Sequence, residues 1–203
     1  MNTDRATNTL IAVVAMWLFV SPAPAADGDG DAGRGRKLAY ACMGCHGIEN
    51  YKNAYPKYSV PRLGGQSAAY IAATLAEYQA GARPHPTMKG FAATLSAQDQ
   101  ADLAAFFQGP QRAPSGAKPV GTLPIAAAAC SACHGQDGIG TLAEHPTLAG
   151  QHADYLAQAL NDYRLGKRQN PVMSAFAAQL TRDDIRALAD YFSKQPGLST
   201  PKL

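Results

Sequence analysis

The chain has 203 residues, and its 18 basic and 15 acidic side chains leave a formal net charge of +3. This length accommodates one domain or two. So small a positive charge gives no support to nucleic-acid binding.

The first 25 residues have the pattern of a secretory signal peptide. Arg5 precedes an apolar run over residues 10–20, and Ala-rich residues up to Ala26 provide an Ala-x-Ala cleavage site. The run is shorter than the ~20 apolar residues that a membrane span needs. We therefore predict cleavage after Ala25 and an exported, soluble, periplasmic product, with an uncleaved membrane anchor as the alternative. Residues 27–33 are rich in Asp and Gly and predict a flexible lead-in.

All four cysteines lie in two copies of the motif Cys-x-x-Cys-His, the attachment pattern for c-type haem. The two thiols of the motif add across the haem vinyl groups, and the histidine reaches one face of the iron. The sequence thus predicts two covalently bound haem c groups. The attachment residues are Cys42, Cys45, Cys130 and Cys133, and the proximal iron ligands are His46 and His134.

Zinc, dithiol and disulfide sites are the alternatives for paired cysteines. The two pairs of a zinc ribbon usually lie ~15–20 residues apart, whereas the gap between the pairs here runs from Cys45 to Cys130. A thioredoxin-like motif needs a βαβ pattern beside it, and no strand pattern is present. Structural disulfides give no reason for a histidine to follow both pairs.

The chain contains an internal duplication. Residues 61–108 align with residues 146–193, and 21 of the 48 aligned positions are identical. The haem motifs are offset by three more residues, so the first copy has a longer segment between residues 47 and 60. We predict a signal peptide over 1–25, a first domain over 26–108, a Pro- and Gly-containing linker over 109–122 and a second domain over 123–203.

Three helices are predicted in each copy, and no strand, which gives an all-α fold. The first runs from about Gly33 into Cys42, or from about Pro124 into Cys130. The second spans roughly 67–80 or 152–165, with one apolar face. The third begins at Ser96 or Thr181 with a capping box in which Asp replaces Glu. Domains this small have small cores, which haem would complete.

A methionine is predicted as the second axial ligand of each iron. Met88 and Met173 occupy equivalent positions after a proline, in what the pattern predicts to be loops. His85 could compete with Met88, but its counterpart is Asn170, which favours a surface histidine. A thioether raises the reduction potential of haem, and six-coordinate iron has no open position. Both properties favour electron transfer over catalysis.

With two Cys-x-x-Cys-His motifs, two Pro-x-Met segments and two Leu-x-Gly-Gln motifs, the chain resembles the dihaem cytochrome c4 family. The last motif reads Leu63-Gly64-Gly65-Gln66 and Leu148-Ala149-Gly150-Gln151. The resemblance implies two class I cytochrome c domains related by a pseudo-twofold axis, with the haem propionate edges close together. It also implies a periplasmic carrier of single electrons from a quinol-oxidising complex, a quinol–cytochrome c reductase, toward a terminal oxidase or reductase.

The resemblance further implies roles for two pairs of residues. The carbonyl groups of Pro61 and Pro146 would accept a hydrogen bond from the proximal histidines. Arg83 and Arg168 would bind haem propionates, with solvated surface arginines as the alternative. The Tyr-rich stretch over residues 51–58 departs from the family pattern; it could shield the first haem or dock a partner.

Two other functions stay open at this point. The chain could be the dihaem subunit of a flavocytochrome c sulfide dehydrogenase-like enzyme, bound to a flavoprotein. It could also be an enzyme, a dihaem peroxidase or thiosulfate-oxidising cytochrome, which would require an iron without its methionine.

Overall fold

The computed structural model describes residues 30–55, 57–109, 116 and 118–203. The predicted signal peptide and half of the predicted linker lie outside these residues. The described elements are α1 (Ala32–Leu38), α2 (Tyr40–His46), α3 (Ala68–Ala80), α4 (Pro86–Ala92), α5 (Ala97–Gln108), a 3₁₀ turn η1 (Ile125–Ala127), α6 (Ser131–His134), α7 (Ala153–Arg164), α8 (Pro171–Ala177) and α9 (Arg182–Ser193). The only β pairings in the described part are two isolated bridges, 52 with 59 and 64 with 199. The predicted all-α fold is confirmed.

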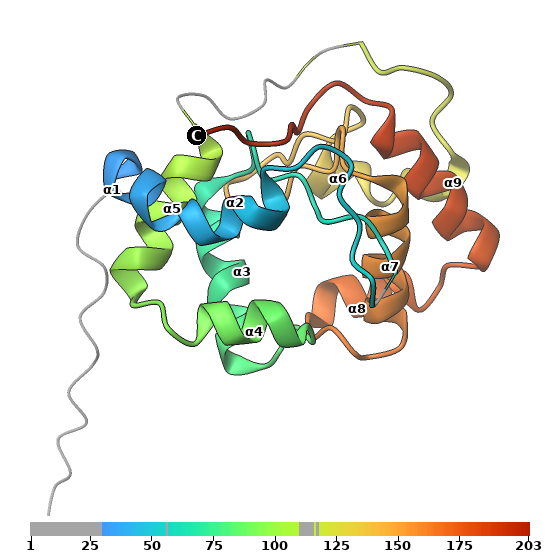
Figure 1. Ribbon diagram of the computed structural model, residues 1–203. Helices are drawn as coiled ribbons and strands as arrows, with labels where there is room; N and C mark the ends of the chain where they lie inside the picture. The colour runs from blue at the N-terminus through green and yellow to red at the C-terminus, as the bar shows by residue number, and fades with distance from the viewer. Residues whose placement is uncertain (1–29, 56, 110–115, 117) are drawn as a thin grey trace, which may run out of the picture.

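The helices form two similar halves, α1–α5 and η1–α9, which lie side by side (Figure 1). In each half, two long helices pack on each other around a small apolar cluster: α3 on α5, and α7 on α9. The first cluster consists of Ala39, Ile71, Leu75, Leu103, Ala104 and Phe107. The second consists of Ala127, Leu156, Leu188, Ala189, Tyr191 and Phe192. Clusters of this size bury little apolar surface, as expected for domains of this length.

The capping boxes at the last helix of each half form as predicted. At α5 the Ser96 side chain accepts from the backbone N–H of Asp99, whose carboxylate accepts from Ser96 N–H. Thr181 and Asp184 make the same reciprocal contacts at α9. The shorter Asp side chain thus serves where the motif usually has Glu.

The first predicted helix of each copy is wrong in part. In the first half the chain turns at Ala39, which separates α1 from α2. In the second half the alanine-rich run forms only η1 before α6 begins at Ser131. Few residues lie between Pro124 and the cysteines, and a helix this short does not repay the cost of its nucleation.

The loops predicted around Met88 and Met173 are helices instead, and this is a second correction. Each methionine lies in the first turn of a short helix, α4 or α8, that begins with proline. Proline suits this position because its fixed φ is already helical and it has no N–H to leave unpaired. The preceding residue caps the helix: His85 Nδ1 accepts from Met88 N–H at 3.3 Å, and Asn170 Oδ1 accepts from Met173 N–H at 3.0 Å.

His85 is therefore not the surface histidine that the pattern predicted. It is half-buried, with its ring centroid 6.4 Å from those of Tyr58 and Tyr78. Asparagine replaces it at the equivalent position because both side chains can accept the hydrogen bond of a helix N-cap.

The halves contact each other through a nearly symmetric set of hydrogen bonds. Gln66 of the first half bonds to the backbone of Thr147, and Gln151 of the second bonds to the backbone of Arg62. The two contacts exchange under the repeat offset, which is the signature of a pseudo-twofold axis. After α9 the chain returns to the first half, where Ser199 and Gly64 exchange backbone hydrogen bonds of 3.0 Å (Figure 1).

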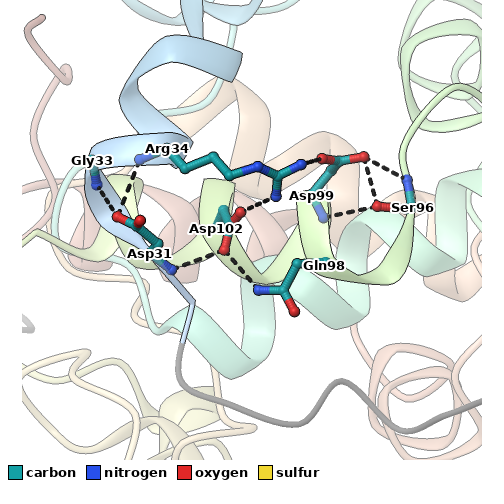
Figure 2. A network of polar contacts seen from close by, with 7 residues as sticks. All are labelled: Asp31, Gly33, Arg34, Ser96, Gln98, Asp99 and Asp102. Atoms are coloured by element: carbon teal, nitrogen blue, oxygen red, sulfur yellow. Dashed lines mark hydrogen bonds and ion pairs between the residues drawn. The ribbon is translucent and has the colours of Figure 1, made fainter.

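A polar network joins α1 to α5 in the first half (Figure 2). The buried carboxylate of Asp102 accepts from Gln98, from Asp31 N–H and from the Arg34 guanidinium, which also pairs with Asp99. The backbone of Gly35 lies so close to Asp102 that a Cβ atom there would meet its carbonyl group. The network therefore holds α1 against α5 at a distance that requires glycine at position 35.

The substitution Asp102→Asn tests this network. The hydrogen bond from Gln98 lowers the pKa of Asp102, and the hydrogen bonds from Asp31 N–H and Arg34 lower it further. Desolvation of the carboxyl group opposes this by raising the pKa, but the net shift is downward. A carboxyl group with a lowered pKa contributes stability above its unfolded pKa of ~3.9, and this is lost as the pH falls through the folded value. Asp102→Asn should thus lower the melting temperature at pH 7 and flatten the acid limb of the stability–pH curve.

The matched control is Asp190→Asn, which removes an exposed ion pair with Lys194. Exposed pairs of this kind contribute little, so this variant should melt close to the wild type. Equal melting temperatures for the two variants at pH 7 would show that the α1–α5 network does not stabilise the fold.

Candidate haem sites

Each half holds its cysteine motif at the end of a helix. Cys42, Cys45 and His46 lie on α2, while Cys130 caps α6, which ends at His134. All four thiols are free and partly exposed. Desolvation raises the pKa of Cys42 and of Cys130, so these groups are neutral thiols at pH 7.

The structure gives no support to the zinc and disulfide alternatives. Among the described residues, no three His, Cys, Asp or Glu side chains lie close enough to hold a metal ion together. The two cysteines of each pair form no disulfide with each other. The histidine that follows each pair matches the haem attachment pattern instead.

Both motif histidines are buried, and one nitrogen of each ring is already in use. His46 Nδ1 lies 2.9 Å from Pro61 O, and His134 Nδ1 lies 3.0 Å from Pro146 O. Desolvation lowers the pKa of both imidazoles, although the carbonyl contacts oppose this. A neutral imidazole that donates Nδ1–H to a carbonyl group presents the lone pair of Nε2, which is the form that binds a metal.

The two methionines are placed differently with respect to the cores. Met88 packs against the first apolar cluster together with Cys42 and Leu63. Met173 is partly buried at the matching position of α8. Despite this difference, each methionine lies on the short helix, α4 or α8, that comes next in the chain after the long helix α3 or α7.

Arg83 and Arg168 are buried, with 4% and 6% of their surface exposed, so the alternative of solvated surface arginines is wrong. Both guanidinium groups donate to one acceptor, the Tyr70 hydroxyl, at 3.2 and 2.9 Å. Arg83 also pairs with Glu77 at 2.7 Å. The Arg168 guanidinium stacks over the Tyr163 ring at 4.7 Å and has no carboxylate partner among the described residues.

Tyr70 lies on the second predicted helix of the first copy, and its hydroxyl belongs to this site. Desolvation alone would raise its pKa, but the charges of Arg83 and Arg168 outweigh this effect and lower it to about 8. Its repeat counterpart, Tyr155, contacts the Tyr58 ring instead. No sequence signal separates the two tyrosines, because the difference arises from how the halves meet.

The two arginines leave an unmet requirement for negative charge. Arg83 Nε and Arg168 Nε are buried and have no hydrogen-bond partner. A buried, unpaired guanidinium donor is costly, and haem propionates are the carboxylates that this pair fits. The residues present therefore fit two haem groups: thiols for attachment, an imidazole Nε2 and a thioether for each iron, and arginines for the propionates.

The Tyr-rich stretch of the first half reaches across to the second (Figure 1). Its end is anchored by Asp154 of α7, whose carboxylate accepts from Ser59 N–H at 3.1 Å and from Ser59 Oγ at 2.9 Å. Lys52 lies 3.3 Å from the same carboxylate. The segment is thus part of the contact between the halves, and it also exposes side chains to solvent, most of all Tyr55, which is 94% exposed.

Comparison with known proteins identifies the class of molecule. The cytochrome c family model matches twice, over residues 32–109 and 124–195. The chain is 33% identical to cytochrome c4 of Pseudomonas aeruginosa over 169 residues, which cover 75% of this chain and 83% of that protein. It is 36% identical to the thiosulfate dehydrogenase electron acceptor of Stutzerimonas stutzeri, covering 76% of this chain and 79% of that one.

A solved structure supports the same relationship. Reduced cytochrome c4 from Pseudomonas stutzeri matches with a TM-score of 0.63 at 32% identity, over 84% of this chain and all of that chain. Two helical domains with one haem motif each define a dihaem c-type cytochrome, which carries two covalently bound haem c groups. The chain belongs to the cytochrome c4 family, and like its members it is an electron carrier rather than an enzyme.

The substitution Tyr70→Phe tests the shared acceptor at the arginine pair. It removes one hydrogen bond from each of two buried guanidinium groups, and bonds to charged groups contribute ~1.5–3 kcal/mol each. We expect the free energy of unfolding of the holoprotein to fall by ~2 kcal/mol, measured by denaturant titration. Tyr155→Phe is the matched control and should cost less than half as much, because no hydrogen bond of its hydroxyl is present among the described residues. Equal losses would contradict a special role for Tyr70.

Proposed function

We propose that His46 and Met88 are the axial ligands of one haem iron, and His134 and Met173 those of the other. Cys42 and Cys45 would attach the first haem. Cys130 and Cys133 would attach the second. The observation that carries this proposal is the geometry of the histidines, which are buried, neutral and held by a proline carbonyl so that Nε2 is free.

The protein's residues would set the properties of these haems. Bound haem supplies the one-electron Fe(III)/Fe(II) couple. The Pro61 and Pro146 carbonyls orient the imidazoles, and the thioethers of Met88 and Met173 favour the reduced iron. Arg83 and Arg168 would hold propionates where the halves meet, which draws the charged edges of both groups toward one interface.

In the cell, the protein would carry single electrons in the periplasm. We place it between a quinol-oxidising complex, a quinol–cytochrome c reductase, and a terminal oxidase or reductase. Its relatedness to cytochrome c4 proteins supports this role. The export pattern of residues 1–25 supports the compartment. No described helix is long and apolar enough to cross a membrane.

The domain boundaries follow from the same proposal. Residues 1–25 would be removed on export, 26–108 and 123–203 would each fold around one haem, and 109–122 would link them. The two matches to the cytochrome c family model agree with this division.

A second candidate donor is a dehydrogenase that passes electrons directly to this protein. The relative from Stutzerimonas stutzeri that is named a thiosulfate dehydrogenase electron acceptor favours it. A flavoprotein partner, as in flavocytochrome c sulfide dehydrogenase, is a third arrangement. Purification of the native protein separates them: a single haem polypeptide supports the free carrier, whereas a co-purifying flavoprotein contradicts it. Stopped-flow reduction by thiosulfate dehydrogenase and by the quinol-oxidising complex then ranks the two donors.

Met88→Ala tests the ligand assignment. Loss of the thioether should lower the potential of the first haem by well over ~100 mV, a modest part of the ~0.8 V range that axial ligands cover. It should also remove about half of the weak far-red absorbance band of methionine-ligated ferric haem. Redox titration and the oxidised absorbance spectrum measure both effects.

Met43→Ala is the control for Met88→Ala. Met43 lies inside the attachment motif, between Cys42 and Cys45, and packs on the same apolar cluster, so it is not a candidate for the second axial ligand. This variant should keep the full far-red band. An unchanged potential in Met88→Ala would show that Met88 is not an iron ligand.

A further inference from the structure

The Leu-x-Gly-Gln motifs form the same tight turn in both halves. Gln66 N–H donates to Leu63 O, and Gln151 N–H donates to Leu148 O, both at 3.1 Å. The glycine before each glutamine has a positive φ, 85° at Gly65 and 72° at Gly150. Glycine is required there because the third residue of such a turn needs a left-handed conformation. The turn thus fixes the direction in which the glutamine leaves its own domain.

Each glutamine side chain crosses the interface and binds one residue of the other domain on both backbone groups. Gln151 Oε1 accepts from Arg62 N–H at 2.9 Å, and Gln151 Nε2 donates to Arg62 O at 3.0 Å. Gln66 makes the same pair of contacts with Thr147, both at 2.9 Å. Both glutamines are 4% exposed. The orientation of the amides is fixed, because a backbone N–H can only face the oxygen.

The residue bound in this way directly follows the proline that contacts the motif histidine. Pro61 O and Arg62 N–H belong to a single peptide group, and so do Pro146 O and Thr147 N–H. On one side that group receives the Nδ1–H of the histidine, and on the other it donates to the glutamine of the opposite domain. In a peptide group, donation by N–H increases the negative charge on the carbonyl oxygen through amide resonance. Hydrogen bonds in such a chain strengthen one another.

We infer that Gln66 and Gln151 are positioning residues that act across the interface, each polarising the peptide group that holds the histidine ligand of the opposite haem. Gln151 acts on His46 through the 61–62 peptide, and Gln66 acts on His134 through the 146–147 peptide. A stronger acceptor for Nδ1–H makes the imidazole a better electron donor, which stabilises Fe(III) and lowers the potential. The inference rests on the proposed ligation of the irons by these histidines.

This arrangement ties the potential of each haem to the contact between the domains. A change in that contact, such as docking of a redox partner, would alter both peptide groups at once.

The test is the crossed effect of Gln151→Met in the holoprotein. Methionine keeps the length of the side chain but can neither accept from Arg62 N–H nor donate to Arg62 O. The Nδ1–H proton resonance of His46 in the reduced protein should move upfield, and the potential of the first haem should rise. The signal of His134 and the second potential should change much less. Gln66→Met should give the mirror image.

Two further variants separate this effect from loosening of the structure. Gln195 is a buried glutamine that binds Val120 N–H and O at 2.8 Å each, in the same two-point manner but on a peptide that holds no histidine. Gln195→Met should shift neither histidine signal. Gln151→Glu loses the donor to Arg62 O but keeps an oxygen that accepts from Arg62 N–H, and it should restore most of the His46 signal. Gln151→Glu also serves as the test variant if Gln151→Met does not take up both haems. In that case, a His46 signal shifted in Gln151→Glu as far as the loss of both hydrogen bonds predicts would contradict the inference.

Shifts that are equal at both histidines, larger in the mutated domain, or absent would overturn the inference. Failure of the proposed function gives a different result: the wild-type protein would then lack histidine–methionine ligation at one or both irons. If both irons show histidine–methionine spectra but the shifts do not appear at the histidine of the opposite domain, the proposed ligation stands and only the cross-domain role of the glutamines is contradicted.

Discussion

The hydrogen bond between each motif histidine and a proline carbonyl is the contact on which the rest of this structure depends. It requires the loop after the cysteine motif to pass beneath the imidazole, and it fixes the neutral tautomer that presents Nε2. The same loop then has to turn sharply at Gly65 or Gly150 before the next helix begins. Because the turn and the proline are only a few residues apart, the position of the histidine and the contact between the domains cannot vary independently. A protein that must transfer electrons rapidly gains from this rigidity, since a ligand that does not move costs little reorganisation.

The interface between the two domains is polar, although a permanent interface between domains would be expected to be mainly apolar. Glutamine amides, a shared tyrosine hydroxyl and two guanidinium groups occupy it, and each is buried with specific partners. Such contacts add little net stability compared with apolar packing, but they define one orientation, because a displaced amide or guanidinium would be left unsatisfied. The exception is the arginine pair, whose Nε atoms have no protein partner. These two buried donors lack an acceptor within the described part of the protein, and the propionates of two haems, which we propose as partners of the arginines, would supply one.

Much of this molecule could be predicted from sequence because duplication repeats each signal. Cysteine spacing, the capping boxes at Ser96 and Thr181 and the long helices were all visible twice, and a pattern that survives in both copies is under the same physical constraint in both. The errors arose where local pattern and context disagree. The alanine-rich run before Cys130 has high helix propensity but too few residues to extend a helix. The sequence predicts loops at Met88 and Met173, whereas the proline before each methionine stands at the first position of a helix and begins it.

What the sequence could not supply was the pairing of residues across the two copies. Gln66 and Gln151 are recognisable as a repeated motif, yet nothing in either copy says that the partner of one lies beside the histidine of the other. The same holds for Tyr70, whose hydroxyl accepts a hydrogen bond from each arginine, whereas Tyr155 interacts with them only through charge. A perfect twofold axis would treat the two tyrosines alike. The added residues of the first copy, anchored to Asp154, break this symmetry on one side of the interface. Two haems in domains of common origin are thus given unequal surroundings, and unequal surroundings are what allow two chemically identical groups to differ in potential.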